Sequence, residues 1–95
     1  MGLQDDAARM LVEALSRRRL GTSMAHGMTP SVSITAYPHA TVYFKLDGLG
    51  GLRTEFVFDG RPPEILNYMP TAADADALAD YTLKRVAGEG GRPPA

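Results

Sequence analysis

The sequence predicts a two-layer α+β domain in which two helices cover one face of a three-stranded antiparallel sheet, in the order α-β-β-β-α. Apolar residues occupy alternate positions through the middle of the chain, a two-residue period that is typical of strands with one buried face. The segments on either side have apolar residues at three- and four-residue spacing, as amphipathic helices do. The alternating positions are all even-numbered: Val32, Ile34, Ala36, Ala40, Val42, Phe44, Leu46, Leu52, Phe56 and Phe58.

The composition predicts a single globular domain across residues 1–95, because 44% of the residues are hydrophobic and 22% are charged. The formal net charge of −1 offers no overall field for nucleic acid or anionic lipid. The chain has no cysteine, which excludes disulfides, thiolate catalysis and cysteine-held metal centres. No apolar run approaches the ~20 residues of a membrane span, and the acidic start is unlike a secretion signal. We therefore expect a cytoplasmic protein without a membrane partner.

The first helix is predicted over residues 4–20, with the folded core extending over about 4–87. Asp5 and Asp6 lie in its first turn and basic residues in its last, as the helix dipole favours. Gly21 is the expected stop. Residues 21–30 have no usable period and contain two glycines and a proline, so a loop is predicted there. The apolar side of the helix comprises Leu3, Ala7, Met10, Leu11, Ala14 and Leu15.

The three strands are predicted at residues 31–37, 41–46 and 52–58. The glycine-rich segment 47–51 reads as a five-residue hairpin loop, because only an odd loop length keeps apolar partners on one face. The resulting cross-strand pairs are Leu46 with Leu52, Phe44 with Thr54, Val42 with Phe56, and Ala40 with Phe58.

Between the first two strands, a three-residue turn at Pro38–Ala40 would place Ile34 opposite Phe44 and preserve the apolar face. One long strand bent at Pro38 is the alternative, provided that the proline lies on an edge or a bulge.

The last helix is predicted over residues 72–87, with Thr71 as N-cap and Asp74 three residues later in a variant of the capping box. Residues 64–69 are too short to assign and are compatible with one helical turn after Pro63. Gly88 is the expected stop, followed by a flexible tail over 88–95. The inward side of the helix comprises Ala75, Leu78, Ala79, Thr82, Leu83 and Val86.

The candidate catalytic and metal-binding side chains form no recognisable motif. Ser23 precedes His26 by three residues without a strand-turn-helix elbow, and His39 has no fixed spacing to either. Asp76 and Asp80 share a helix face but lack the glycine of a calcium loop. The sequence therefore predicts no catalytic residue, no metal and no cofactor.

Arg17, Arg18 and Arg19 form the one basic cluster, which we interpret as favourable charge at a helix C-terminus. Contact with phosphates, in a nucleic-acid-associated regulator, is the alternative. The element order matches that of the double-stranded-RNA-binding domain. That family has lysines at the start of its last helix, where this chain has Asp74 and Asp76, so the resemblance is limited to the order of elements.

The odd-numbered face of the sheet is the predicted protein-binding surface, because tyrosine and arginine are enriched at protein contacts. Its candidate residues are Tyr37, Tyr43, Lys45, Arg53 and Glu55. An exposed edge strand would also allow pairing with a second copy of the chain, in a homodimer. We thus expect a non-enzymatic protein-binding domain, an inhibitor or accessory factor of bacterial or phage origin, for example a phage protein that blocks a host defence complex. The third hypothesis is a small ligand binder or enzyme whose site forms between subunits.

Overall fold

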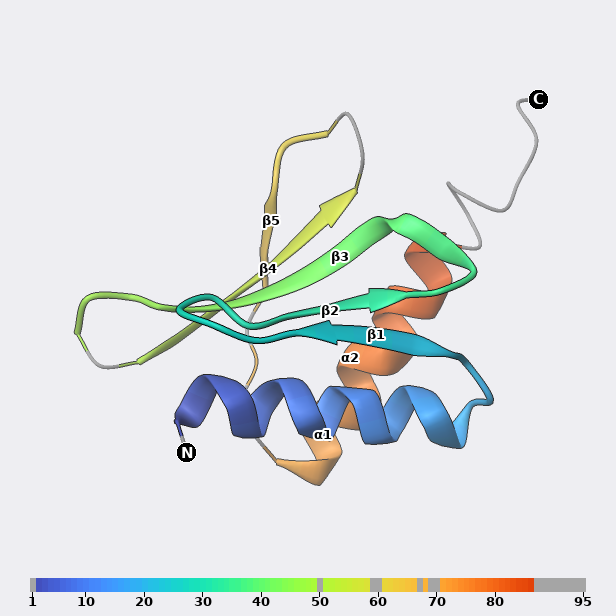
Figure 1. Ribbon diagram of the computed structural model, residues 1–95, viewed down its shortest axis with the longest axis horizontal. Coiled ribbons are helices and arrows are strands. Elements are labelled where there is room, and N and C mark those ends of the chain that lie inside the picture. Colours follow the sequence, from blue (N-terminus) through green and yellow to red (C-terminus); the bar gives the residue numbers. More distant parts are fainter. Residues whose placement is uncertain (1, 50, 59–60, 67, 69–70, 87–95) are drawn as a thin grey trace.

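The computed structural model describes residues 2–49, 51–58, 61–66, 68 and 71–86. The described residues form an α+β domain in which two helices pack on one side of a five-stranded antiparallel sheet (Figure 1). The strands lie in the sheet in sequence order. The elements are α1 (Leu3–Arg17), β1 (Thr22–Ala25), β2 (Ser31–Ile34), β3 (Tyr37–Leu46), β4 (Leu52–Phe58), β5 (Glu64–Leu66) and α2 (Ala72–Arg85).

The predicted number of three strands is wrong because both edge strands were missed. β1 lies inside the expected loop 21–30, and β5 lies in residues 64–69, for which the sequence is compatible with one helical turn. Each edge strand is short and has one hydrogen-bonded neighbour, β2 and β4 respectively. Backbone hydrogen bonds require no particular side chain, so such strands need show no apolar alternation. Contacts from α2 also hold β5, since the Glu64 carboxylate accepts a hydrogen bond from Tyr81 and pairs with Arg85.

The turn between β2 and β3 also differs from the expectation of a turn at Pro38–Ala40. The chain turns at residues 35–36, and β3 then runs through residues 38–40. The pairing shifts register between Ser33↔Thr41 and Ile34↔Tyr37, which leaves residues 38–40 without a regular partner in β2. A proline lacks the N–H that a ladder needs, and an irregular pairing tolerates it. Neither the expected pairing of Ile34 with Phe44 nor a single bent strand is present, because Val32 lies opposite Val42.

The β3–β4 hairpin has the predicted register at each of the four predicted pairs, from Leu46↔Leu52 to Ala40↔Phe58. Asp47 organises the loop, because one of its carboxylate oxygens accepts from the backbone N–H groups of Leu49 at 2.7 Å and Gly51 at 3.0 Å. Gly48 adopts φ +88°, which a side chain would disfavour. The residues of the loop therefore favour the same turn that the alternation of apolar residues in β3 and β4 requires.

The helix bounds differ from the expected ones, because α1 spans Leu3–Arg17 rather than 4–20 and α2 spans Ala72–Arg85 rather than 72–87. α1 ends at Arg17, and Arg19 rather than Gly21 takes the left-handed conformation, with φ 62°. The Leu20 amide closes the turn on the Leu15 carbonyl at 3.1 Å. At the start of α2, the Thr71 side chain accepts from the Asp74 amide at 3.2 Å, which confirms the predicted N-cap. The expected stop at Gly88 and the tail 88–95 lie outside the described residues.

The core lies between the helices and the even-numbered side chains of the sheet. Phe44 and Phe56 are its largest fully buried side chains. Tyr68, which the sequence did not single out, packs on Phe44 with ring centroids 5.7 Å apart and donates its hydroxyl to the Ala7 carbonyl. Burial, with a smaller contribution from Asp74, raises the pKa of Tyr68 to about 12. This buried phenol therefore stays neutral at physiological pH.

Replacing Thr54 by valine is expected to raise the free energy of unfolding by about 1 kcal/mol. The Thr54 hydroxyl is fully buried and has no hydrogen-bond partner within the described part of the chain. An isosteric methyl group removes the cost of burying that hydroxyl. Urea denaturation at neutral pH measures the change. The matched control is Thr82→Val, since the equally buried Thr82 hydroxyl donates to the Leu78 carbonyl at 2.8 Å and its loss should destabilise. Destabilisation by Thr54→Val would mean that this hydroxyl is satisfied.

Candidate functional site

The sheet has one face that no described helix covers. Both helices pack on the even-numbered side chains, so the odd-numbered side chains of the strands face away from them (Figure 1). We call this surface the open face. Its members are Ser23, Ala25, Ser31, Ser33, Thr41, Tyr43, Lys45, Arg53, Glu55, Val57 and Ile65.

The register of the strands arranges these side chains in rows. One row crosses all five strands and contains Ala25, Ser31, Tyr43, Glu55 and Ile65. In the next row, towards the β3–β4 hairpin loop, Lys45 lies directly opposite Arg53. Four of the five predicted protein-binding residues are therefore brought together, and they are Tyr43, Lys45, Arg53 and Glu55.

Glu55 lies at the centre of this group and is only 6% exposed. Each of its carboxylate oxygens holds one cation: Oε1 lies 3.1 Å from Lys45 Nζ, and Oε2 accepts from Arg53 Nε at 2.9 Å. Burial by itself would raise the pKa of Glu55, but the hydrogen bonds and charges of Lys45 and Arg53 outweigh it and lower the pKa. The carboxylate is thus ionised at neutral pH and fixes the position of two long cationic side chains.

Two residues of this region lie where the sequence did not place them. Tyr37, a predicted binding residue, lies opposite Ile34 beyond the register shift and packs against the hydrophobic core, away from the other four. Ile65 was missed, although it lies beside Glu55 on the open face and is 56% exposed. Its odd residue number would place it on the open face, but this can be inferred only once β5 is recognised as a strand.

The arginine cluster of the nucleic-acid hypothesis joins the two helices. Arg17 contacts the Asp76 carboxylate at 2.9 Å, and Arg18 contacts Asp80 at 3.0 Å and Asp76 at 3.3 Å. Hydrogen bonds from Arg17 and Arg18 lower the pKa of Asp76. Arg19 is exposed and takes no part in these pairs. Asp76 and Asp80 of α2 thus have arginine partners on α1, and these ion pairs link the two helices.

Exposed apolar side chains gather at one end of the molecule. Leu3 begins α1, Met28 lies in the β1–β2 connection, and Leu46 and Leu49 lie at the β3–β4 hairpin. These segments lie toward the same end of the molecule in Figure 1. The side-chain amide of Gln4 links them, because it donates to the carbonyls of Met28 and Phe44 at 3.0 Å. This end adjoins the Lys45–Arg53 row through β3.

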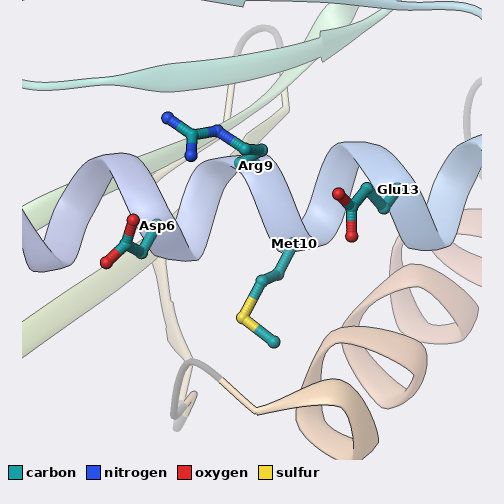
Figure 2. A pocket seen from close by; sticks show the side chains of 4 residues that line it. All are labelled: Asp6, Arg9, Met10 and Glu13. Atoms are coloured by element: carbon teal, nitrogen blue, oxygen red, sulfur yellow. The ribbon is translucent and has the colours of Figure 1, made fainter. Parts of the chain in front are cut away.

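The described residues contain no recognisable catalytic or metal-binding arrangement. No group of three or more histidine, aspartate or glutamate side chains among them could hold a metal ion. A cavity of about 340 Å³ lies along α1, with Asp6, Arg9, Met10 and Glu13 lining it. Figure 2 shows these four side chains projecting from one helix without converging on a point. Ser23 lies on β1 and His26 in the connection after it, and the His39 side chain lies outside the described part.

The fold and the open face define the molecule as a small two-layer α+β domain with one uncovered sheet surface. Neither described helix is long and apolar enough to cross a membrane. The chain matches no known family model, no curated protein and no solved structure, so no relative supplies a function for this surface.

Proposed function

We propose that the protein is a non-enzymatic protein-binding domain, an inhibitor or accessory factor of bacterial or phage origin, which acts by occupying the surface of a partner protein. The observation that carries this proposal is the open face. There, Tyr43, Lys45, Arg53 and the exposed Ile65 surround a buried carboxylate on a side of the sheet that no described helix covers.

The construction of this face suits protein binding. A tyrosine ring and a guanidinium bury a large area for few lost rotamers, and such side chains dominate the energy of many interfaces. Glu55 already restrains Lys45 and Arg53 through its two carboxylate oxygens. Because ordering long side chains opposes association, this restraint lowers the entropic cost of binding.

The two alternatives have less support. A nucleic-acid-associated regulator would need the arginine cluster, but Arg17 and Arg18 are engaged with acidic residues of α2. The third hypothesis, a ligand binder or enzyme with a site between subunits, has no specific observation among the described residues in its favour. The open face therefore remains the best-supported surface.

Truncating Tyr43 or Arg53 to alanine is expected to weaken partner binding by ~1–3 kcal/mol, about 5- to 150-fold in Kd. Affinity capture from bacterial host cells with mass spectrometry identifies the partner, and calorimetry with the purified partner gives the affinities. Arg9→Ala, on the exposed side of α1, is the matched control and should bind normally. Circular dichroism verifies that each variant is folded.

A captured partner that both open-face variants still bind normally would contradict the proposal. Salt-sensitive binding of duplex or single-stranded nucleic acid, lost on Arg17→Glu and Arg18→Glu, would instead favour the regulator hypothesis.

A further inference from the structure

The exposed charge of the open face is positive. Its charged members are Lys45, Arg53 and Glu55, and their side chains are 44%, 51% and 8% exposed. The face therefore presents an ammonium and a guanidinium to solvent, with the one carboxylate beneath them. This local surplus contrasts with the net charge of −1 on the whole chain.

Both cations keep hydrogen-bond donors for a ligand. Arg53 uses Nε for Glu55, and its two terminal nitrogens have no partner among the described contacts. Those nitrogens form the fork that binds a carboxylate through two parallel hydrogen bonds. Lys45 Nζ contacts one oxygen of Glu55, which leaves two of its three N–H groups for another acceptor. The side chains are thus oriented by Glu55 and still able to bind an anion.

The pairing of Lys45 with Arg53 carries an electrostatic cost in the free protein. Like charges directly opposite each other in a sheet are destabilising, and one carboxylate neutralises only one of these two cations. A second carboxylate arriving from outside would neutralise the other and accept the remaining hydrogen bonds. Charge complementarity therefore specifies the ligand chemistry.

We infer that the open face binds an acidic, extended segment of a partner protein, with a glutamate or aspartate side chain on Lys45 and Arg53 and an apolar side chain against Tyr43 and Ile65. This inference rests on the proposed function. Along β3, Lys45 lies two residues after Tyr43, a distance of roughly 6.6 Å. Residues on the same side of an extended peptide have this same spacing. The ligand pattern is thus an acidic residue and an apolar residue two positions apart.

Amide-detected NMR titration of the labelled protein with two capped synthetic peptides tests this inference. One peptide is Thr-Glu-Thr-Leu-Thr-Glu-Thr, and the matched peptide has glutamine in place of each glutamate. We expect the acidic peptide to shift the amide signals of Tyr43, Lys45, Arg53, Glu55 and Ile65, and its affinity to fall as salt is raised. The glutamine peptide should bind at least about tenfold more weakly.

Arg53→Gln should abolish these shifts, whereas Arg9→Gln on α1 should leave them unchanged. If Arg53→Gln fails to fold, Lys45→Gln replaces it, with binding by the acidic peptide again expected to be lost. Equal binding of the two peptides, shifts confined to other regions, or no shift would overturn the inference. Tighter binding of a single-stranded oligonucleotide to the same residues would also overturn it, in favour of a phosphate ligand.

Affinity capture of the cellular partner distinguishes a failure of this inference from a failure of the proposed function. A cellular partner that depends on Tyr43 and Arg53 but binds independently of salt would overturn the acidic ligand and leave the protein-binding function standing. Loss of both the peptide shifts and any partner dependent on Tyr43 and Arg53 would overturn the two together.

Discussion

Replacing Phe44 by alanine is expected to lower the free energy of unfolding by about 3–5 kcal/mol. Phe44 is fully buried between the sheet and the helices, and its ring packs on Tyr68. Truncation removes that apolar burial and leaves a cavity that the surrounding strands can only partly close. A domain of this size has a total stability of roughly 5–15 kcal/mol, so the change is a large fraction of it. Urea denaturation followed by circular dichroism measures the loss.

Tyr43→Ala is the internal control, because Tyr43 is the preceding residue on the same strand and belongs to the open face. It should change stability by less than about 1 kcal/mol. If Phe44→Ala does not fold, Phe44→Leu gives a smaller, measurable loss at the same position. A larger loss from Tyr43→Ala than from the Phe44 variants would mean that the sheet faces the other way, with the proposed binding surface as the core.

Replacing Glu55 by glutamine is expected to destabilise the protein by about 2 kcal/mol at neutral pH. The carboxylate holds two charge-assisted contacts, which are each worth roughly 1.5–3 kcal/mol when well buried. Lys45 and Arg53 are half-exposed, so solvent screening reduces that value. The change also leaves these cations opposite each other without a counter-charge. Glu13→Gln, at an exposed position on α1, should stay within about 0.5 kcal/mol of the original protein.

The contribution of Glu55 also depends on pH, with a defined sign. Its folded pKa is lowered below the ordinary value of 4.5, so the unfolded chain takes up the proton first as the pH falls. The stabilisation is fully present above about pH 4.5 and is lost as the pH falls through the folded pKa. The stability difference between the original protein and Glu55→Gln should therefore shrink in acid. A difference that stays constant between pH 7 and strongly acidic solution would contradict the role given to this carboxylate.

The even-numbered apolar face was predictable because strand periodicity is a local property of the chain. Val42, Phe44 and Phe56 lie in the core, as their alternation indicates, and the hairpin at residues 47–51 has the register that its odd length requires. The cap at Thr71 is equally local, since a side chain and an amide three residues later suffice to form it. The same parity argument placed Tyr43, Lys45, Arg53 and Glu55 on one face.

The sequence by itself determined the α+β class, the buried face of the central strands and the β3–β4 register, because these depend on neighbouring residues and on one short loop. Only the tertiary structure decided the edge strands, the irregular pairing around Pro38, and the helix partners of Arg17 and Arg18. The edge strands are held by backbone hydrogen bonds to β2 and β4, which leave no period in the sequence, and the ion pairs of Arg17 and Arg18 join helices from opposite ends of the chain. The position of Ile65 on the open face and the burial of Glu55 beneath its two cations follow from the pairing of β4 with β3 and β5.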